Sequence, residues 1–405
     1  MRISTLQAFN NGVTGIQRNY ANATRTQEQI STGNRILTPA DDPVASVRLL
    51  QLEQQQNVLG QYNSNLTAAK NSLTQEEVTL NSVNTVLQRV RELAVQAGNG
   101  ALDPQDRKAI AAELGEREDE LLSLMNTRNA RGEYLFSGFQ GKTQPFVRGT
   151  DGSYSYQGDE GQRKLQIASS LNVPISDNGK SIFENVTNAG RLGAAVSDQA
   201  ASTLNVSDAL VSDEVAFAGI GGLEITFSAS PNERNYSVAD ASGNVLSTGS
   251  LDSDGEKENK LVVGGVTLYI SGEPTAGEVI TIPESESPKQ GVLDTIANLR
   301  KALEDPATGN TGVRDAVAVA LTNLDHGMVS VDAARGNIGA RLNTIDTTLT
   351  DNEDVALVNK GVQAELRELD YAEALSRLSM QTVILEAAQQ SYVKISGLSL
   401  FNVMR

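Results

Sequence analysis

The residue types that usually carry catalytic or metal chemistry are scarce in this sequence. Its 405 residues include no Cys and a single His, His326. A zinc site is therefore nearly excluded, and Ser-His-Asp catalysis would have to use His326 with no nucleophile-elbow motif nearby. We expect this histidine to lie on the surface or at a helix end. Asp252-Ser-Asp-Gly255 begins like a calcium loop, but the residues after it do not follow the EF-hand spacing. We therefore predict no catalytic residue, no cofactor and no metal site.

The acidic residues indicate what the chain does not bind. The net charge of -17 repels phosphate backbones and anionic lipid headgroups, so neither nucleic-acid binding nor membrane insertion is expected. No run of about 18 apolar residues predicts a transmembrane helix, and the N-terminus lacks the apolar core of a cleavable secretory signal. A cluster of carboxylates beside Arg117 is interpreted as a solvated helix face: Glu113, Glu116, Glu118, Asp119 and Glu120.

Composition favours long, thin elements over a large globular enzyme. Only 4% of the residues are aromatic, and Trp is absent, whereas large aromatics dominate compact cores and ligand pockets. Apolar residues from Tyr62 to Ala97 recur in steps of three and four, which predicts a continuous helix with a coiled-coil seam. Gly98-Asn99-Gly100 should end this helix, and Asp103-Pro104 should begin the next one.

The middle of the chain, residues 141–288, changes to short β-prone runs between turn residues. Leu223–Phe227 and Val279–Ile282 are typical of strands, and Val262–Thr267, with Gly264-Gly265 at its centre, predicts a two-residue hairpin. This segment holds 9 Lys and Arg against 20 Asp and Glu, a balance of -11. We interpret it as a β-rich lobe that faces solvent.

The last part of the chain, residues 289–405, returns to a helical pattern, with a seam from Val355 to Ile395. The predicted fold is therefore mainly α with an inserted β domain, in which the N- and C-terminal segments form a long antiparallel helical rod. We predict three domains: a terminal helical domain of residues 1–45 and 360–405, a helical rod of 46–140 and 289–359, and a β-rich surface domain of 141–288.

Both ends of the chain carry thin apolar stripes that have little to bury by themselves. Helices of this kind are marginal alone in water, so we expect them to become ordered by packing against neighbouring copies. A permanently docked helix pair is the alternative. The predicted assembly residues are Ile3, Leu6, Phe9, Val13, Ile16, Tyr20, Leu375, Leu378, Leu385, Tyr392, Ile395, Leu398, Leu400 and Phe401.

A helix–turn–helix break near the N-terminus suggests a family. Ser31-Thr-Gly-Asn-Arg-Ile36 is followed by Pro39-Ala-Asp-Asp-Pro-Val44. Gly33 suits a helix C-cap, Asp41 or Asp42 can cap a new helix, and Pro43 is tolerated in its first turn. Together with the order of the three zones, this turn resembles the flagellin-family signature. The signature residues here are Gly33, Arg35, Ile36, Asp41, Asp42 and Pro43.

Three further segments suggest a place within that family. Met1-Arg-Ile-Ser-Thr5, Tyr134-Leu-Phe-Ser-Gly138 and the tail from Gln389 to Phe401 resemble subunits that join hook to filament more than filament flagellins. The resemblance implies a structural, non-enzymatic subunit of the bacterial flagellum that is exported through the flagellar type III apparatus. It implies a homo-oligomeric ring that contacts hook-associated protein 1 and flagellin, and a cytoplasmic export chaperone.

Three alternatives stay open from the sequence. The chain could be a filament flagellin, or a secreted coiled-coil effector or translocator, although such a protein would need an apolar membrane-inserting segment that is not found. An enzyme within the β lobe is the most remote alternative. It would require a pocket there that gathers titratable groups.

Overall fold

The computed structural model describes residues 2–284 and 287–403. The chain divides into two compact units. The terminal unit consists of residues 1–65 and 346–405, and the central unit consists of residues 66–345. Two long helices, α2 (Pro43–Ala97) and α6 (Gly309–Arg367), contribute residues to both units.

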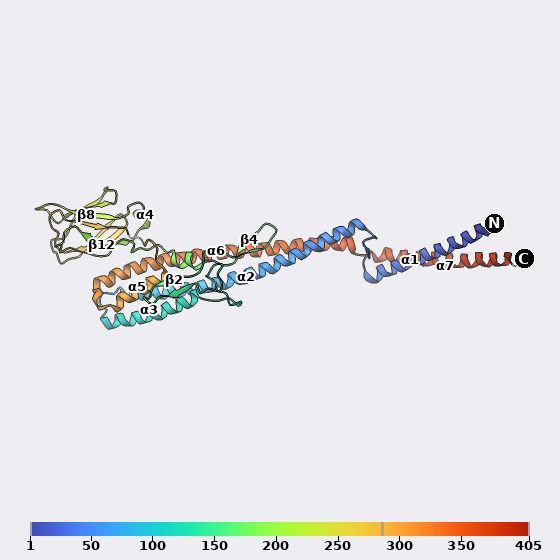
Figure 1. Ribbon diagram of the computed structural model, residues 1–405, viewed down its shortest axis with the longest axis horizontal. Coiled ribbons are helices and arrows are strands. Elements are labelled where there is room, and N and C mark those ends of the chain that lie inside the picture. The colour runs from blue at the N-terminus through green and yellow to red at the C-terminus, as the bar shows by residue number, and fades with distance from the viewer. Residues whose placement is uncertain (1, 285–286, 404–405) are drawn as a thin grey trace. The chain divides into compact units, whose positions relative to one another are not determined.

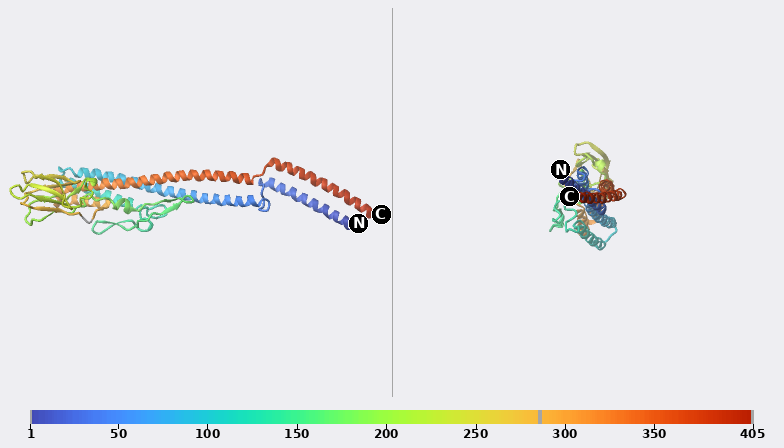
Figure 2. Two further views of the ribbon diagram at one scale, coloured as in Figure 1. Left: turned by 90° about the horizontal axis from the view of Figure 1, so that it is seen from above. Right: turned by 90° about the vertical axis from the view of Figure 1, so that its right-hand side faces the viewer.

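The terminal unit is built from antiparallel helices. Helices α1 (Arg2–Thr32) and α7 (Tyr371–Val403) pack along each other. Phe9 lies against Tyr392 and Gln29 bonds to Arg377, so the two helices run in opposite directions. Figures 1 and 2 show these two helices side by side, with the N- and C-terminal ends together.

The helices of the central unit bury an almost wholly aliphatic core. Helix α3 (Pro104–Met125) packs against α5 (Val292–Glu304), which is followed by a 3-10 turn, Pro306–Thr308. On α2, the buried side chains recur every three or four residues, as a core-facing stripe requires. They include Leu66, Ala69, Leu73, Leu80, Val83, Leu87, Val90 and Ala94, each at most 1% exposed.

Between α3 and α5 the chain first forms short hairpins around an aromatic cluster. Phe136, Phe146 and Phe183 are each at most 1% exposed, and the Phe183 ring lies edge-on to the other two, with centroids 5.3 and 5.8 Å apart. These edge-to-face contacts suit the ring quadrupoles. The elements are β1 (Phe146–Arg148) paired with β2 (Tyr154–Tyr156), β3 (Lys164–Gln166) paired with β4 (Asn172–Pro174), and the π-helix η1 (Lys180–Glu184).

The β lobe follows, with two antiparallel sheets around its own core. One sheet has the strand order β10-β9-β8-β13-β5, and the other has β11-β12-β6, with β7 also paired to β12. Val211, Ile225, Val238 and Val266 are fully buried in the core of the lobe. The elements are β5 (Val196–Ser197), β6 (Asn205–Val206), β7 (Leu210–Val211), α4 (Glu214–Phe217), β8 (Leu223–Phe227), β9 (Asn235–Asp240), β10 (Val245–Ser250), β11 (Asn259–Val263), β12 (Val266–Ser271) and β13 (Val279–Ile282).

The fold class predicted from the sequence is confirmed: the protein is mainly α with an inserted β domain. The predicted helix over 62–97 lies within α2 and ends at Ala97, and Asp103 caps α3 by accepting the N–H groups of Gln105 and Asp106. The predicted hairpin at Gly264-Gly265 joins β11 to β12. The three-domain division stays a prediction.

The C-terminal seam predicted from Val355 to Ile395 extends over two helices, α6 and α7. Its spacing runs without interruption from Val355 to Ile395, but α6 ends at Arg367 and α7 begins at Tyr371. Asp370 caps α7 by accepting the N–H groups of Ala372 and Glu373. These side-chain bonds to the backbone favour a new helix start over continuation.

Candidate assembly surface and its joint

The predicted helix–turn–helix break connects α1 to α2 within the terminal unit. Gly33 ends α1 in a left-handed conformation, with φ of 72°, and its N–H donates to the Gln29 carbonyl at 2.8 Å. Asp42 caps α2 by accepting the Ala45 N–H at 3.0 Å, and Pro43 occupies the first helical position. Of the two candidate caps, Asp42 therefore caps the helix.

Asp41 instead holds the loop between the two helices. Its carboxylate accepts the backbone N–H groups of Leu37 and Thr38 at 2.9 and 3.0 Å, and the Thr38 hydroxyl at 2.8 Å. It also pairs with Arg25. The hydrogen bonds from Thr38, ahead of the charge of Arg25, hold the pKa of Asp41 below its usual range. The carboxylate is thus kept ionised in the form that organises the loop.

The same turn is bonded to the break between α6 and α7. The Arg35 N–H donates to the Arg367 carbonyl at 2.8 Å, and its guanidinium donates to the Leu366 carbonyl at 3.0 Å. The Leu369 N–H donates back to the Gly33 carbonyl at 3.0 Å. We call residues 33–42 and 366–370 the double joint. The two interruptions between helices lie against each other there, and each satisfies backbone hydrogen-bonding groups of the other. Ile36 is half-buried beside them.

Beyond the double joint, α1 and α7 cover each other only along one seam. Of the predicted assembly residues, Val13, Ile16, Leu378, Leu385 and Tyr392 are half-buried. Four others are exposed: Phe9, Tyr20, Leu375 and Ile395, at 49, 63, 54 and 66%. The side chains of Ile3, Leu6, Leu398, Leu400 and Phe401 lie outside the described residues. A pair of helices therefore leaves much of its apolar surface in water.

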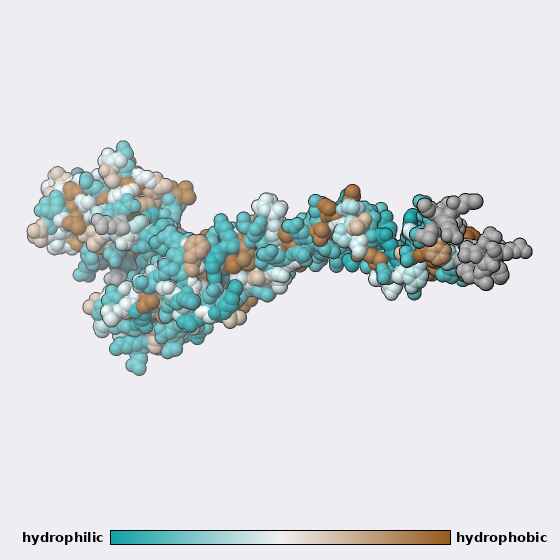
Figure 3. Space-filling view, turned by 45° about the vertical axis from the view of Figure 1, so that its right-hand side comes forward, coloured by the Kyte–Doolittle hydropathy of each residue, from teal (hydrophilic) through white to brown (hydrophobic). Residues whose placement is uncertain are grey.

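The structure adds apolar positions that the sequence reasoning missed. On α7, Met380, Val383 and Ile384 are 68, 62 and 47% exposed. At about 100° per residue they lie on the side of α7 away from the seam residues Leu378 and Leu385. The run Val383-Ile384-Leu385 is the sequence signal that could have revealed them, because three successive apolar residues cannot share one helix face. Figure 3 shows hydrophobic side chains at the surface of the helices. In the terminal unit, further exposed apolar side chains include Val44, Val47, Leu50, Leu357 and Val358.

Two carboxylates of the central unit are buried, and one of them departs from the prediction. Glu118 was interpreted as part of a solvated face, but it is fully buried. It accepts the Tyr154 hydroxyl and pairs with Arg300 at 2.9 Å, which explains how a carboxylate can lie there. Glu76, the polar interruption of the α2 seam, is 1% exposed and accepts the Asp177 N–H at 3.1 Å.

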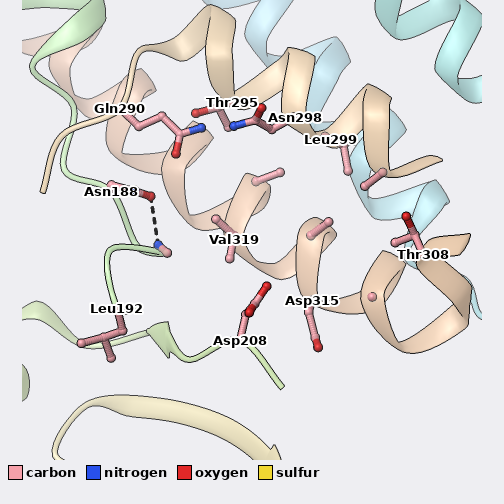
Figure 4. A pocket seen from close by; sticks show the side chains of 15 residues that line it. Asn188, Leu192, Asp208, Gln290, Thr295, Asn298, Leu299, Thr308, Asp315 and Val319 are labelled. Carbon is pink, nitrogen blue, oxygen red and sulfur yellow. Dashed lines mark hydrogen bonds between the residues drawn. The ribbon is translucent and has the colours of Figure 1, made fainter. Parts of the chain in front are cut away.

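The single histidine and one of the cavities lie along α6. His326 lies half-buried in the middle of α6, not at a helix end, and its Nδ1 contacts the Thr187 carbonyl oxygen at 3.0 Å. A cavity of about 430 Å³ lies beside α5 and α6 (Figure 4). Asp208 and Asp315 line it, and burial, with Asp208 a lesser cause, raises the pKa of Asp315. Its lining includes neither histidine nor lysine.

The described part of the chain contains neither a cluster of metal ligands nor a membrane-spanning helix. Among residues 2–284 and 287–403, His, Asp and Glu side chains do not gather in threes as a metal site requires. Over the same ranges, no helix combines the length and the apolarity that a bilayer crossing needs.

Comparison with known proteins gives one consistent result. Residues 3–141 match the bacterial flagellin N-terminal helical region. The chain is 25% identical over its full length, and over the full length of the relatives, to flagellar hook-associated protein 3 of Salmonella typhimurium and of Escherichia coli. Flagellar hook-associated protein 3 of Legionella pneumophila has a solved structure that is similar with a TM-score of 0.63 and 26% identity, covering 78% of this chain and 98% of that one. FlgL from Xanthomonas campestris gives a TM-score of 0.61 at 26% identity, covering 77% and 99%.

Proposed function

We propose that this chain, which carries the flagellin N-terminal helical region and resembles flagellar hook-associated protein 3 from end to end, is a structural subunit of the hook–filament junction. One observation carries the proposal: the similarity to hook-associated protein 3 spans all of both chains. Flagellin of Clostridium tyrobutyricum also matches 94% of this chain, at 24% identity, but the solved structures with TM-scores of 0.61 and 0.63 are FlgL and hook-associated protein 3.

The proposed mechanism is assembly, without catalysis. The terminal unit leaves Tyr20, Met380 and Ile395 more than 60% exposed, and each such side chain gains roughly 1.5–3 kcal/mol when it is fully buried. Neighbouring copies in a ring supply that cover, and α1 and α7 become fully ordered on packing against them. Because the joining faces of a ring subunit differ, each copy contacts the next head-to-tail.

The proposed partners follow from this position in the flagellum. The ring of copies contacts hook-associated protein 1 on one side and flagellin on the other. Before assembly, a cytoplasmic export chaperone covers the apolar faces of α7, and the subunit leaves the cell through the flagellar type III export apparatus. The final location is extracellular, within the flagellum.

The test is deletion of the encoding gene, followed by electron microscopy of the cells. We expect hooks without filaments and flagellin monomers released into the medium, with filaments restored by the wild-type gene. Released flagellin separates a junction subunit from a filament flagellin, whose deletion would leave no flagellin to release. Intact, firmly attached filaments on the deletion strain would overturn the proposal.

A further inference from the structure

The chain has three Asn-Gly pairs, and two of them lie in the central unit. Asn99-Gly100 occupies the turn between α2 and α3, and Asn178-Gly179 directly precedes η1, whereas Asn11-Gly12 lies within α1. An asparagine in such a pair can lose its side-chain amide without an enzyme. The glycine nitrogen attacks the side-chain carbonyl carbon, and glycine has no Cβ to obstruct the attack. The surroundings of each pair therefore decide whether it reacts.

The attacking nitrogen is free at the first pair of the central unit. Gly100 lies between the two helices, and its N–H has no hydrogen-bond acceptor among the described residues. An added Cβ at Gly100 would meet no heavy atom within 4 Å. Gly98, Asn99 and Gly100 are all exposed. The Gly100 nitrogen can therefore move toward an electrophile without giving up a hydrogen bond or displacing a neighbour.

The side chain of Asn99 is held close to that nitrogen. Its Oδ1 accepts the Ala101 N–H at 3.2 Å, and its backbone carbonyl accepts the Leu102 N–H at 3.1 Å. An asparagine that bonds to the backbone N–H two residues later folds its side chain over the intervening peptide, which here belongs to Gly100. The same bond from Ala101 stabilises the negative charge that develops on Oδ1 during the attack.

The second pair of the central unit is protected at both residues. The Gly179 N–H donates to the Phe136 carbonyl at 2.8 Å. The Asn178 side chain is 8% exposed, and it accepts the Ser181 N–H at 2.9 Å and donates to the Glu160 carbonyl at 3.3 Å. A reaction at this pair would first have to break these bonds in a buried place.

We propose that Asn99 is a site of spontaneous deamidation. The Gly100 nitrogen forms a bond to Cγ of Asn99, the bond from Cγ to Nδ2 breaks, and the Gly100 proton leaves with Nδ2 as ammonia. Water then opens the resulting succinimide ring. Attack of water at Cγ gives aspartate, and attack at the main-chain carbonyl carbon gives isoaspartate, in which the main chain runs through Cβ and Cγ. The net reaction consumes water and releases ammonia, with no change of oxidation state.

The turn can accept the negative charge that this reaction adds. Asn99 and Arg107 line the same hollow, of about 240 Å³, beside the start of α6. Arg107 donates to the Leu102 carbonyl and to the Asn310 side chain, and no carboxylate pairs with it among the described residues. A carboxylate at position 99 would therefore gain a nearby cation in a chain whose net charge is -17. Because the reaction needs neither enzyme nor cofactor, the modified fraction should grow with the age of the molecule.

The test is mass spectrometry of proteolytic peptides after incubation of the purified full chain at neutral pH. Samples taken before incubation correct for conversion during digestion. We expect Asn99 to convert to aspartate and isoaspartate at least roughly tenfold faster than Asn178, since small departures from a productive geometry cost factors of this size. Gly100→Ala should slow conversion at Asn99 by a similar factor and leave the rate at Asn178 unchanged. Equal rates at the two asparagines of the wild type, or an unchanged rate at Asn99 in Gly100→Ala, would overturn the proposal.

The same measurement in urea separates the effect of the fold from that of the neighbouring sequence. Without their native surroundings, Asn99 and Asn178 should convert at similar rates, because both are followed by glycine. A preference for Asn99 that persists unchanged in urea would contradict the argument from the turn. This comparison uses the wild-type chain alone, so it stands even if Gly100→Ala failed to fold. It does not involve assembly, so it also stands if the gene deletion overturned the proposed function.

Discussion

Glu76 provides the sharpest quantitative test of the central unit. Its carboxyl is 1% exposed, and Asp177, Arg341 and Arg163 face it. Arg341 is bound on both nitrogens by Asp177, at 3.0 Å, so it compensates a second charge at Glu76 only in part. Burial, followed by the charge of Asp177, raises the pKa of Glu76 from 4.5 to about 8.

The sign of the pH dependence follows from this shift. The buried site favours the neutral form of the carboxyl. Glu76 therefore does not lower the free energy of unfolding below pH 4.5, and it lowers that free energy more and more as the pH rises toward 8. Each pH unit between those values costs about 1.4 kcal/mol, or roughly 3 kcal/mol at neutral pH. Glu76→Gln keeps the shape and the acceptor for the Asp177 N–H, and it cannot ionise.

The assay is urea unfolding of wild type and Glu76→Gln from pH 5 to pH 9. We expect the difference in unfolding free energy to be close to zero at the acid end, to grow in favour of the variant, and to level off above pH 8. Glu77→Gln is the control: its carboxylate is 37% exposed in an ion pair with Arg335, so its effect should stay below about 1 kcal/mol at every pH. A difference that does not change with pH would refute the reasoning.

Two further substitutions test the buried ion pair and the double joint. Arg300→Met removes the closest cation from fully buried Glu118 and should lower the unfolding free energy by about 3–5 kcal/mol. If Glu118→Gln in the same chain recovers none of that loss, the cause is not the unpaired charge. Gly33→Ala places a Cβ in a left-handed residue 2.9 Å from the Tyr371 hydroxyl. It should speed hydrogen exchange across the double joint roughly tenfold, as a cost of 1–2 kcal/mol implies. Gly336→Ala, in open space on α6, should not speed it.

The sequence predicts the helices and the turn well because local chemistry sets them. Periodic apolar residues mark α2, and Gly33 and Pro43 end one helix and begin the next for reasons that lie within a few residues. The hairpin at Gly264-Gly265 is equally local, since both glycines have positive φ.

The features that sequence reasoning missed depend on partners far away in the chain. Glu118 belongs to a run of carboxylates, and its burial depends on Tyr154 and on Arg300, which lies 182 residues later. The break before α7 is stabilised by the bond of Leu369 to Gly33. The spacing of the seam contains no information about such a partner.

The double joint also has a mechanical consequence. A single uncoiled segment between two helices would act as a soft swivel, because its backbone could rotate freely. Here Arg35 and Leu369 bond the α1–α2 connection to the α6–α7 connection, so neither connection can twist without straining the other. A torque applied to one of the two helix connections would therefore pass to the other, and the terminal unit would resist twisting at this point as a pair of linked helices.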